Sequence, residues 1–480
     1  MAELHKLSTS STILRSSRAR VAIGVIVVSA CAPSCAGTAM PTPEAPAPHL
    51  RGAVVARPAS AERARDDSMN QVLDPSAKSN VALEGILAFA DAHSPVLLVA
   101  RSTRSRAEAA RVAASMLLPA NPELSVAAGP RYGASGRGID VDISLTQQIQ
   151  IAGERGMRID AADRYRELTD AEIEQVRWAV HCDVHAAFHR ALVERDRAQL
   201  AERVVSFQRS VLGVVERQIA AGETAPLTLR LAQAEVAQAE QVLVSAEQSL
   251  FASRIRLAQL SGWPITSPPM PTGAVDSPRD PPPLDRLGAI ARERLPSLRV
   301  GSARIREASA RVEVADRERW PRPSLGVQYR REGNPSTEGV YDIVMGIVAI
   351  PVPSFQRNQG ERARARAELT VAQAELEASR RLLQGQIAEA RSEVVAAAAR
   401  TRAYGAEILP RFEENLTLLR RSFELGEIDI LALSTGRERF LRIQSDALAA
   451  QQDYFIALAG LERVVGVDLW RDDHHDVESQ

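Results

Sequence analysis

The chain has 480 residues, and its 59 basic and 60 acidic side chains nearly cancel. Hydrophobic residues make up 45% of it but aromatic residues only 4%, and no basic tail or run of mixed aromatic and cationic residues stands out, which argues against a nucleic-acid partner. The sequence has neither a GxxxxGKS/T motif nor a GxGxxG between a predicted strand and helix, so we expect no nucleotide site. No catalytic constellation is recognisable either, which predicts a protein without enzyme activity.

Residues 1–30 are predicted to be a secretory signal peptide. Three arginines precede the apolar run VAIGVIVV at 21–28, and small residues follow it. The run is too short to span a bilayer, and we expect no later stretch to reach the roughly 20 apolar residues that a spanning helix needs. The tetrapeptide Val28-Ser29-Ala30-Cys31 is similar to a bacterial lipobox, which predicts that Cys31 is lipidated. The alternative is cleavage elsewhere, with Cys31 unmodified.

Residues 31–79 are rich in Pro and Ala and are expected to form a lipidated, flexible leader. A Pro-rich linker at 263–283 then separates two halves, 80–262 and 284–468, and a polar tail covers 469–480. The halves match each other in order, pairing Pro95 with Pro296, Pro122 with Pro323, Gly156 with Gly360, Leu227 with Leu431 and Gly262 with Gly466. Ordered matches of this kind predict an internal duplication.

Each half predicts the order helix, strand, strand, long helix, turn, helix. The segment NPELSVAAGPRYGASGRGIDVDISLTQQIQ (121–150) alternates apolar and polar residues on both sides of a Gly-rich turn, as a hairpin does. RPSLGVQYRREG (322–333) and GVYDIVMGIVAIPVP (339–353) predict a second hairpin. We expect one face of these strands to be polar, carrying Asp142, Ser144, Thr146, Gln328 and Asp342. The other face is expected to be apolar, including Leu325, Val327, Tyr329, Tyr341, Ile343, Met345 and Ile347.

The long helices are predicted over 156–221 and 360–425. At 1.5 Å per residue each would reach roughly 100 Å. Apolar residues such as Leu376, Leu383 and Ile387 form a stripe suited to antiparallel packing. Gly222 and Gly426 are typical of helix ends. Each long helix is therefore expected to fold back on the shorter helix that follows it.

Four strands of this length suit a membrane, but they cannot close a sheet within one chain, and a sheet in lipid cannot leave its edges unpaired. Other copies must pair with the edges. Two copies would give eight strands with a filled interior, and three would give twelve around an open lumen. The alternative is a soluble protein whose two hairpins pack on its helices.

The duplicated plan of helices and hairpins resembles the TolC family of outer-membrane efflux channels. LPANPELSV followed by DISLTQQIQIAGERG looks like the heavy-metal branch of that family, the outer-membrane factors of cobalt–zinc–cadmium and copper–silver export. That branch typically has an NPEL strand opening and an LSQxIExAGKRG segment. Here Thr146-Gln147-Gln148-Ile149 replaces part of the second motif, and Glu154-Arg155-Gly156 stands where Lys-Arg-Gly is common. The likeness covers about residues 80 to 468.

This resemblance implies a mainly α fold with a small β part. It implies a homotrimer, in which a twelve-stranded β-barrel in the outer membrane continues into a periplasmic barrel of twelve helices. It also implies docking to a periplasmic adaptor and to a proton-driven inner-membrane pump of the RND type. The cargo would be heavy-metal cations, exported without a cofactor.

The turns at 220–229 and 424–433 lie at the far end of the long helices from the strands. By resemblance, the closed aperture and the adaptor contacts lie there, at Gly222, Glu223, Leu227, Gly426, Glu427 and Asp429. Glu427 and Asp429 would form a carboxylate ring that attracts cations. The alternative is that each Gly-Glu only ends a helix and places an acid favourably at the start of the next one.

The segment HCDVHAAFH places His181, His185 and His189 on one helical face. Histidines four residues apart can hold a divalent metal, but one face offers at most two ligands to an ion, so polar wall positions are the simpler interpretation. We predict no metal site.

Two other functions remain open at this stage. The same duct could serve organic drugs or type I protein secretion. A periplasmic adaptor or coiled-coil scaffold is the alternative from another class, although an adaptor usually has one helical hairpin flanked by β-rich domains.

Overall fold

The computed structural model of this protein describes residues 80–133, 136–222, 225–273, 277–333, 341–425 and 427–469. The expected signal peptide, the leader, and the tail beyond Leu469 lie outside these ranges, as do Cys31, Glu223 and Gly426. Within the described residues the chain is mainly helical with a small sheet, as the sequence predicts.

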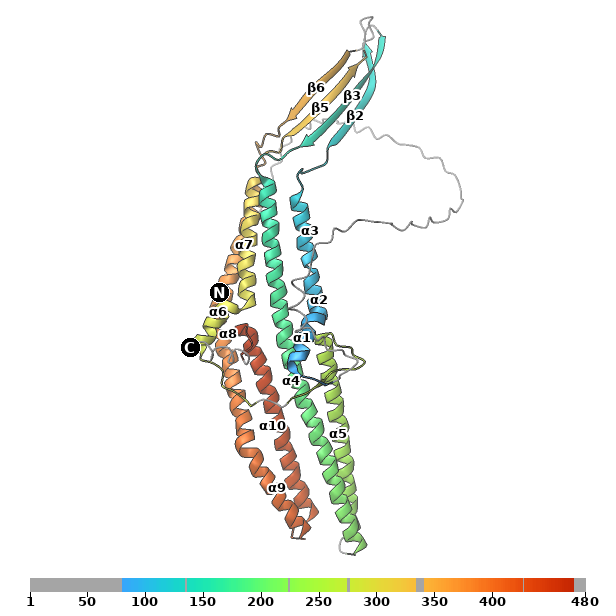
Figure 1. Ribbon diagram of the computed structural model, residues 1–480, viewed down its shortest axis with the longest axis vertical. Coiled ribbons are helices and arrows are strands. Elements are labelled where there is room, and N and C mark those ends of the chain that lie inside the picture. The colour runs from blue at the N-terminus through green and yellow to red at the C-terminus, as the bar shows by residue number, and fades with distance from the viewer. Residues whose placement is uncertain are drawn as a thin grey trace, which may run out of the picture. The chain divides into compact units, whose positions relative to one another are not determined.

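The first half places three short helices before a hairpin and two long helices after it (Figure 1). Its elements are β1 (Asn80–Val81), α1 (Leu83–His93), α2 (Pro95–Ser102), α3 (Arg104–Ser115), β2 (Glu123–Gly133), β3 (Gly136–Gln148), α4 (Glu154–Ala220) and α5 (Pro226–Ser261). The α4 helix has 67 residues, far more than the three turns of an average helix. It ends where Gly222 adopts a left-handed conformation, with φ of 76°, and α5 begins with Pro226 in its first turn.

The second half repeats this plan with two helices before its hairpin instead of three (Figure 1). After β4 (Met270–Pro271) in the linker, it comprises α6 (Leu284–Arg294), α7 (Pro296–Arg317), β5 (Ser324–Glu332), β6 (Tyr341–Ala349), α8 (Gln359–Ala403), the π-helical turn η1 (Tyr404–Ile408), α9 (Leu409–Glu424) and α10 (Ile430–Val465). The two short strands that the sequence did not predict, β1 and β4, pair in parallel and tie the start of the first half to the linker.

The second long helix, predicted over 360–425, is helical from Gln359 to Glu424 but is not α-helical throughout. The helix widens into a π turn at Tyr404–Ile408, and α9 then starts with Pro410 in its first turn. Proline has no N–H to donate to the carbonyl four residues back, and its ring crowds that carbonyl. A π turn is one of the few ways in which a long helix accommodates such a break.

One stretch passes the length and hydropathy test for a membrane span, contrary to our expectation. It covers residues 83–115, but the structure divides it into α1, α2 and α3, and Pro95 begins the second of these helices. Ile86, Phe89 and Leu97 are buried in a cluster with residues of α4 and α5. The stretch therefore forms three helices that pack beside α4, the first two of them also against α5.

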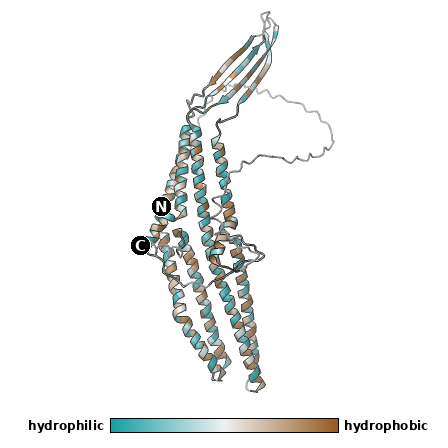
Figure 2. Ribbon diagram, viewed as in Figure 1, coloured by the Kyte–Doolittle hydropathy of each residue, from teal (hydrophilic) through white to brown (hydrophobic). Residues whose placement is uncertain are grey.

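The four long strands form one antiparallel sheet in the order β2-β3-β5-β6. Polar and apolar residues alternate along its first three strands, as the colouring of Figure 2 shows. Asp142 lies opposite Arg330, and Ser144 opposite Gln328, on one face. Leu124 and Val126 lie opposite Leu145 and Ile143 on the other face.

The sequence prediction for the faces of β6 is wrong. Ile343 lies opposite Arg330 and Met345 opposite Gln328, which puts them on the polar face. Asp342 lies on the other face, where its carboxylate accepts a hydrogen bond from the Tyr329 hydroxyl at 2.7 Å. Since the residues of β6 are apolar on both faces, alternation alone could not fix its orientation, and a shift by one residue exchanges the faces.

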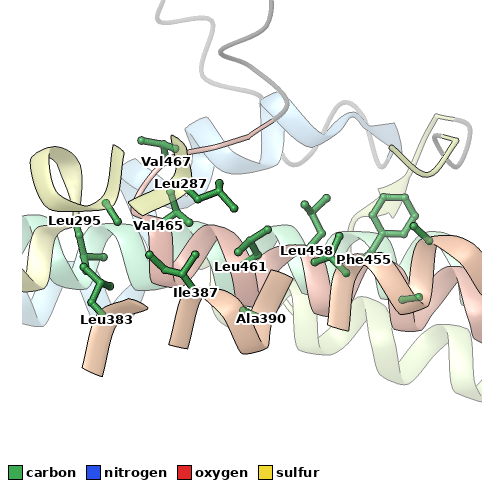
Figure 3. Packing of buried hydrophobic residues seen from close by; sticks show 14 of the residues in the cluster. Leu287, Leu295, Leu383, Ile387, Ala390, Phe455, Leu458, Leu461, Val465 and Val467 are labelled. Carbon is green, nitrogen blue, oxygen red and sulfur yellow. The ribbon is translucent and has the colours of Figure 1, made fainter. Parts of the chain in front are cut away.

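The helices pack in the same sequence as the strands that they carry. Beside the sheet the order of contact is α3, α4, α7, α8, and toward the two turns it is α5, α4, α10, then α8 and α9. The largest apolar core lies among α6, α7, α8 and α10. Figure 3 shows its side chains converging, among them Leu287, Leu295, Leu383, Ile387, Ala390, Phe455, Leu458, Leu461 and Val465. Full burial of each such leucine or isoleucine contributes about 1.5–3 kcal/mol.

The Pro-rich linker is tied to the helices through its backbone. Arg254 of α5 donates hydrogen bonds to the carbonyls of Pro268 and Pro269, and Arg195 of α4 donates to those of Pro271 and Gly273. Farther along, Arg391 of α8 donates to the carbonyl of Pro282 at 2.9 Å. We call the linker with these contacts the strap.

Candidate functional site

The polar face of the sheet carries two linked groups of charges. The Asp142 carboxylate accepts hydrogen bonds from Gln328, at 2.6 and 2.8 Å, and from the Arg330 guanidinium at 3.0 Å. Nearer the hairpin turns, Arg131 lies 2.8 Å from Asp140 and 3.3 Å from Glu332. These contacts join β2, β3 and β5, so this face is built to keep charges paired while it meets water.

The opposite face of the sheet is apolar and uncovered in the single chain. Its large side chains on all four strands are 37–71% exposed: Leu124, Val126, Ile143, Leu145, Leu325, Val327, Val344 and Val348. Monomeric soluble proteins rarely leave such a continuous apolar surface open to water. A face of this kind suits contact with lipid.

Both edges of the sheet are unpaired within the described residues. The strands β2 and β6 each have a neighbour on one side only. The helices α3 and α8, which end the same row, also carry exposed apolar residues, among them Val112, Val371 and Leu382. An open edge in a membrane leaves backbone groups without hydrogen-bond partners, so the row must continue into another chain if the sheet lies in lipid.

The two turns far from the sheet form what we call the tip (Figure 1). In the first turn the apolar side chain of Leu227 is 66% exposed. In the second turn Glu427 and Asp429 are both exposed. The Asp429 carboxylate accepts a hydrogen bond from the backbone N–H of Ala432 at 2.8 Å and so caps the start of α10.

A small apolar core lies directly behind the tip and joins its two hairpins. It contains Val211 and Val215 of α4, Ala232 of α5, Phe423 of α9 and Leu433 of α10. The side chains of the tip therefore stand on a packed base, which leaves its charged and apolar groups free to face a partner or a lumen.

Next to this core, sequence reasoning missed a buried cation. Arg437 of α10 is 4% exposed. Its guanidinium donates to the Val204 carbonyl at 3.0 Å and lies 4.3 Å from the centre of the Phe207 ring, both on α4. Burial lowers the pKa of Arg437 to about 10. No pattern in the sequence marks this arginine among the many in the chain, because its partner on α4 is a backbone oxygen.

The three histidines of α4 meet the end of α10 in a buried polar contact that we call the seam. The His185 Nδ1 lies 3.0 Å from the Glu462 carboxylate, and its Nε2 lies 3.2 Å from the Nε2 of His189. The His189 ring is stacked on Phe455 with ring centres 3.9 Å apart. His181 lies 3.9 Å from Asp468. Two of the three histidines thus use their ring nitrogens on each other and on Glu462, and no group of three or more metal-ligating side chains occurs in the described part of the chain.

Burial decides the charge states along the seam. Burial, and to a smaller extent the neighbouring His185, lower the pKa of His189 to about 3. Burial opposes the charge on His185 as well, but the hydrogen bond and charge of Glu462 outweigh it, so the pKa of His185 is raised. Burial raises the pKa of Glu462, and its hydrogen bond with His185 offsets part of that rise. The seam therefore holds a neutral His189 behind a His185–Glu462 pair.

The sequence was also compared with known proteins. The model of the family described as outer membrane efflux protein matches residues 87–263 and 287–467. The cobalt-zinc-cadmium resistance protein CzcC of Cupriavidus metallidurans is 27% identical over 321 residues, which cover 66% of this chain and 75% of the relative.

Two further relatives match over shorter stretches. The nickel-cobalt-cadmium resistance protein NccC of Alcaligenes xylosoxydans xylosoxydans is 28% identical over 51% of this chain and 56% of the relative. The pyoverdine export outer membrane protein OpmQ of Pseudomonas putida is 24% identical, over 52% of each chain. The matches span about half the length of these two relatives.

Solved structures show the same fold. The structure of CusC superposes with a TM-score of 0.63 at 14% identity, covering 80% of this chain and 92% of that one. The outer membrane protein VceC of Vibrio cholerae superposes with a TM-score of 0.61 at 17% identity, covering 81% and 96%.

Proposed function

The chain belongs to the outer membrane efflux protein family, and we propose that three copies of it form the outer-membrane duct of a tripartite system that exports heavy-metal cations. The observation that carries the proposal is the combination of an uncovered apolar sheet face with unpaired edges at β2 and β6. Three copies of a four-stranded sheet would supply twelve strands, enough for a barrel with an open lumen. The same pairing of copies would cover the exposed apolar residues of α3 and α8.

The organisation of the chain follows from this proposal. We propose that residues 80–262 and 284–468 are duplicated units, which is supported by their similar order of elements and by two separate matches to one family model. The signal peptide at 1–30 would direct the chain out of the cytoplasm, and lipid on Cys31 would anchor its N-terminus in the outer membrane. As a passive conduit the protein would need no catalytic group or cofactor.

The tip would dock a periplasmic adaptor and, through it, an RND-type inner-membrane pump. We assign this contact to Gly222, Glu223, Leu227, Gly426, Glu427 and Asp429. Its support is the exposed position of Leu227, Glu427 and Asp429 on a packed base. In a trimer the carboxylates of Glu427 and Asp429 would gather three-fold around the lumen and favour cations.

The proposed ring of carboxylates is tested by a substitution that removes the charge of Asp429 but keeps its helix cap. Asparagine caps a helix about as well as aspartate, so Asp429→Asn should leave α10 intact and lower the preference for cations over anions. The measurement is the reversal potential of single channels in a planar bilayer across a salt gradient. An unchanged reversal potential in Asp429→Asn and in Glu427→Gln would show that these carboxylates do not select cations.

The cargo is tested by growth of a deletion strain on zinc, cobalt, cadmium, copper and silver beside a panel of dyes, antibiotics and siderophores. We expect the deletion strain to be sensitive to metals only, and we expect the gene to restore its resistance. The second candidate is the same duct serving organic molecules, which the similarity to OpmQ favours. Sensitivity to organic compounds alone would select that candidate. A soluble protein that never forms outer-membrane trimers would favour the adaptor or scaffold instead.

A further inference from the structure

Four connecting segments link the sheet to the helices, and each exposes large apolar side chains. The first half contributes residues 116–122 and 149–153, and the second half contributes 318–323 and 350–358 (Figure 1). Phe355 is 88% exposed, the highest value among the large hydrophobic residues described, and Val352 is 80% exposed. These exposed apolar side chains lie beyond the ends of the strands.

Strand length places these segments at the surface of the membrane, if the sheet lies in lipid as we propose. The strands β5 and β6 have nine residues each. At about 3.3 Å per residue and a tilt of about 40°, nine residues rise about 23 Å, close to the 25 Å height of the apolar band of an outer-membrane barrel. Residues just beyond Ser324 and Ala349 therefore lie where acyl chains give way to headgroups.

The two halves differ in what they present at this level. The segments of the first half carry aliphatic residues such as Leu117 and Ile151, and neither an aromatic residue nor an arginine. The segments of the second half carry Trp320 and Phe355 with three arginines, Arg319, Arg322 and Arg357. Tryptophan with arginine is the combination that suits a membrane interface, because the ring tolerates both phases and guanidinium binds phosphate in a bidentate manner.

A hollow of about 660 Å³ is bordered mainly by the two segments of the second half, from Glu318 to Arg322 and from Pro351 to Gln356 with Asn358, and also by Gln148 at the end of β3. The Arg319 guanidinium lies 5.6 Å from the centre of the Trp320 ring, and no ion pair is found for it among the described residues. Arg322 forms an ion pair with Glu318 at 3.1 Å. Prolines on both sides restrict the backbone, so the hollow is bordered by stiff segments and keeps one uncompensated cation.

We propose that this hollow binds the phosphate-bearing headgroup of a phospholipid of the periplasmic leaflet, and that only the second half of each chain carries such a site. Arg319 contacts the phosphate, and Trp320, Val352 and Phe355 lie beside it at the level of the headgroups. A trimer would then hold its lipid at alternate connecting segments around the barrel. The inference rests on the proposed membrane position of the sheet.

The test uses the full chain extracted in mild detergent and washed to constant phosphorus content. The Arg319→Gln/Arg322→Gln double variant should retain about half as much phospholipid per chain as the wild type, or less, because it loses both guanidinium groups. Arg381→Gln is the control, since Arg381 is an exposed arginine on α8 that does not line the hollow and pairs with Glu377. Equal phospholipid in all three proteins would overturn the proposal.

A second measurement locates the lipid without depending on arginine. Brominated phospholipids in reconstituted vesicles should quench the fluorescence of the wild type but much less that of Trp320→Phe. Equal quenching of both proteins would also overturn the proposal. Trimer formation and conductance are recorded on the same samples, so that a working channel without bound lipid refutes only the lipid site, whereas a chain that neither assembles nor inserts refutes the proposed duct.

Discussion

Replacing His189 with phenylalanine should remove much of the acid sensitivity of the folded chain. The ring of His189 is buried and neutral, with its pKa lowered to about 3, whereas an unfolded histidine titrates near 6.5. Between these values the unfolded chain binds more protons than the folded chain, so the stability that comes from a neutral His189 is complete above about pH 6.5 and is lost as the pH falls toward 3. Phenylalanine keeps the stacking on Phe455 and has no proton to bind.

The size of the effect follows from the two pKa values. At pH 5 the unfolded histidine is almost fully protonated and the folded one almost fully neutral, which lowers the free energy of unfolding by about 2 kcal/mol per chain relative to pH 7.5. This figure changes little if the folded pKa is 4 instead of 3. His185 works in the opposite direction, since its raised pKa adds stability as the pH falls and so offsets part of the loss caused by His189.

The measurement is therefore a difference between two proteins. Urea titrations of the wild type and of His189→Phe, at pH 7.5 and 5.0 and at one protein concentration, give the loss of stability for each. The other charged or titratable groups at the seam are His181, Cys182, Asp183, Arg463 and Asp468, and they are common to both proteins. The wild type should lose about 2 kcal/mol more than the variant. His93→Phe, at an exposed position, is the control. An equal loss in wild type and His189→Phe would refute a buried neutral ring.

Two further predictions concern packing and backbone. Ile387→Ala in the main core should lower the free energy of unfolding by about 2–5 kcal/mol, through lost burial and a residual cavity. The control Ile265→Ala, in the exposed part of the linker, should change it by less than about 0.5 kcal/mol. Similar thermal midpoints for the two variants would contradict the assigned core. Gly262→Ala should destabilise the chain more than Gly222→Ala. Both glycines are left-handed, but a Cβ at 262 would lie 2.1 Å from the His93 carbonyl oxygen while one at 222 meets open space. Left-handed backbone alone costs about 1–2 kcal/mol, so equal midpoints would mean that the contact with His93 does not form.

The long helices and the hairpins could be predicted from the sequence because their signals are local. The predicted start at 156 and end at 221 of the first long helix lie within two residues of Glu154 and Ala220, since Gly153 and Gly222 end the helical run at each side. The alternation along β2, β3 and β5 was also sufficient to separate a polar from an apolar face. In β6 it failed, because apolar residues occupy both faces of the strand.

What the sequence could not supply are contacts between residues far apart in the chain. His185 was visible as one of three histidines on a helical face, but Glu462, which fixes its charge, lies 277 residues away. Arg437 has a backbone carbonyl and an aromatic face as partners, and neither leaves a sequence pattern. The π turn at Tyr404–Ile408 follows from Pro410 only once the helix is known to continue on both sides of it.

The strap has a consequence for how its sequence can change. Its anchors are main-chain oxygens, and the side chains that hold them belong to α4, α5 and α8. Carbonyl oxygens are the same in every residue type, so a substitution in the strap that preserves the backbone path leaves each anchor in place, whereas the loss of one arginine on a helix removes its anchor entirely. These hydrogen bonds thus constrain the arginines of the long helices, whereas other positions of the strap are constrained through their own side chains, as Trp263 is by its burial and Asp280 by its ion pair with Arg402.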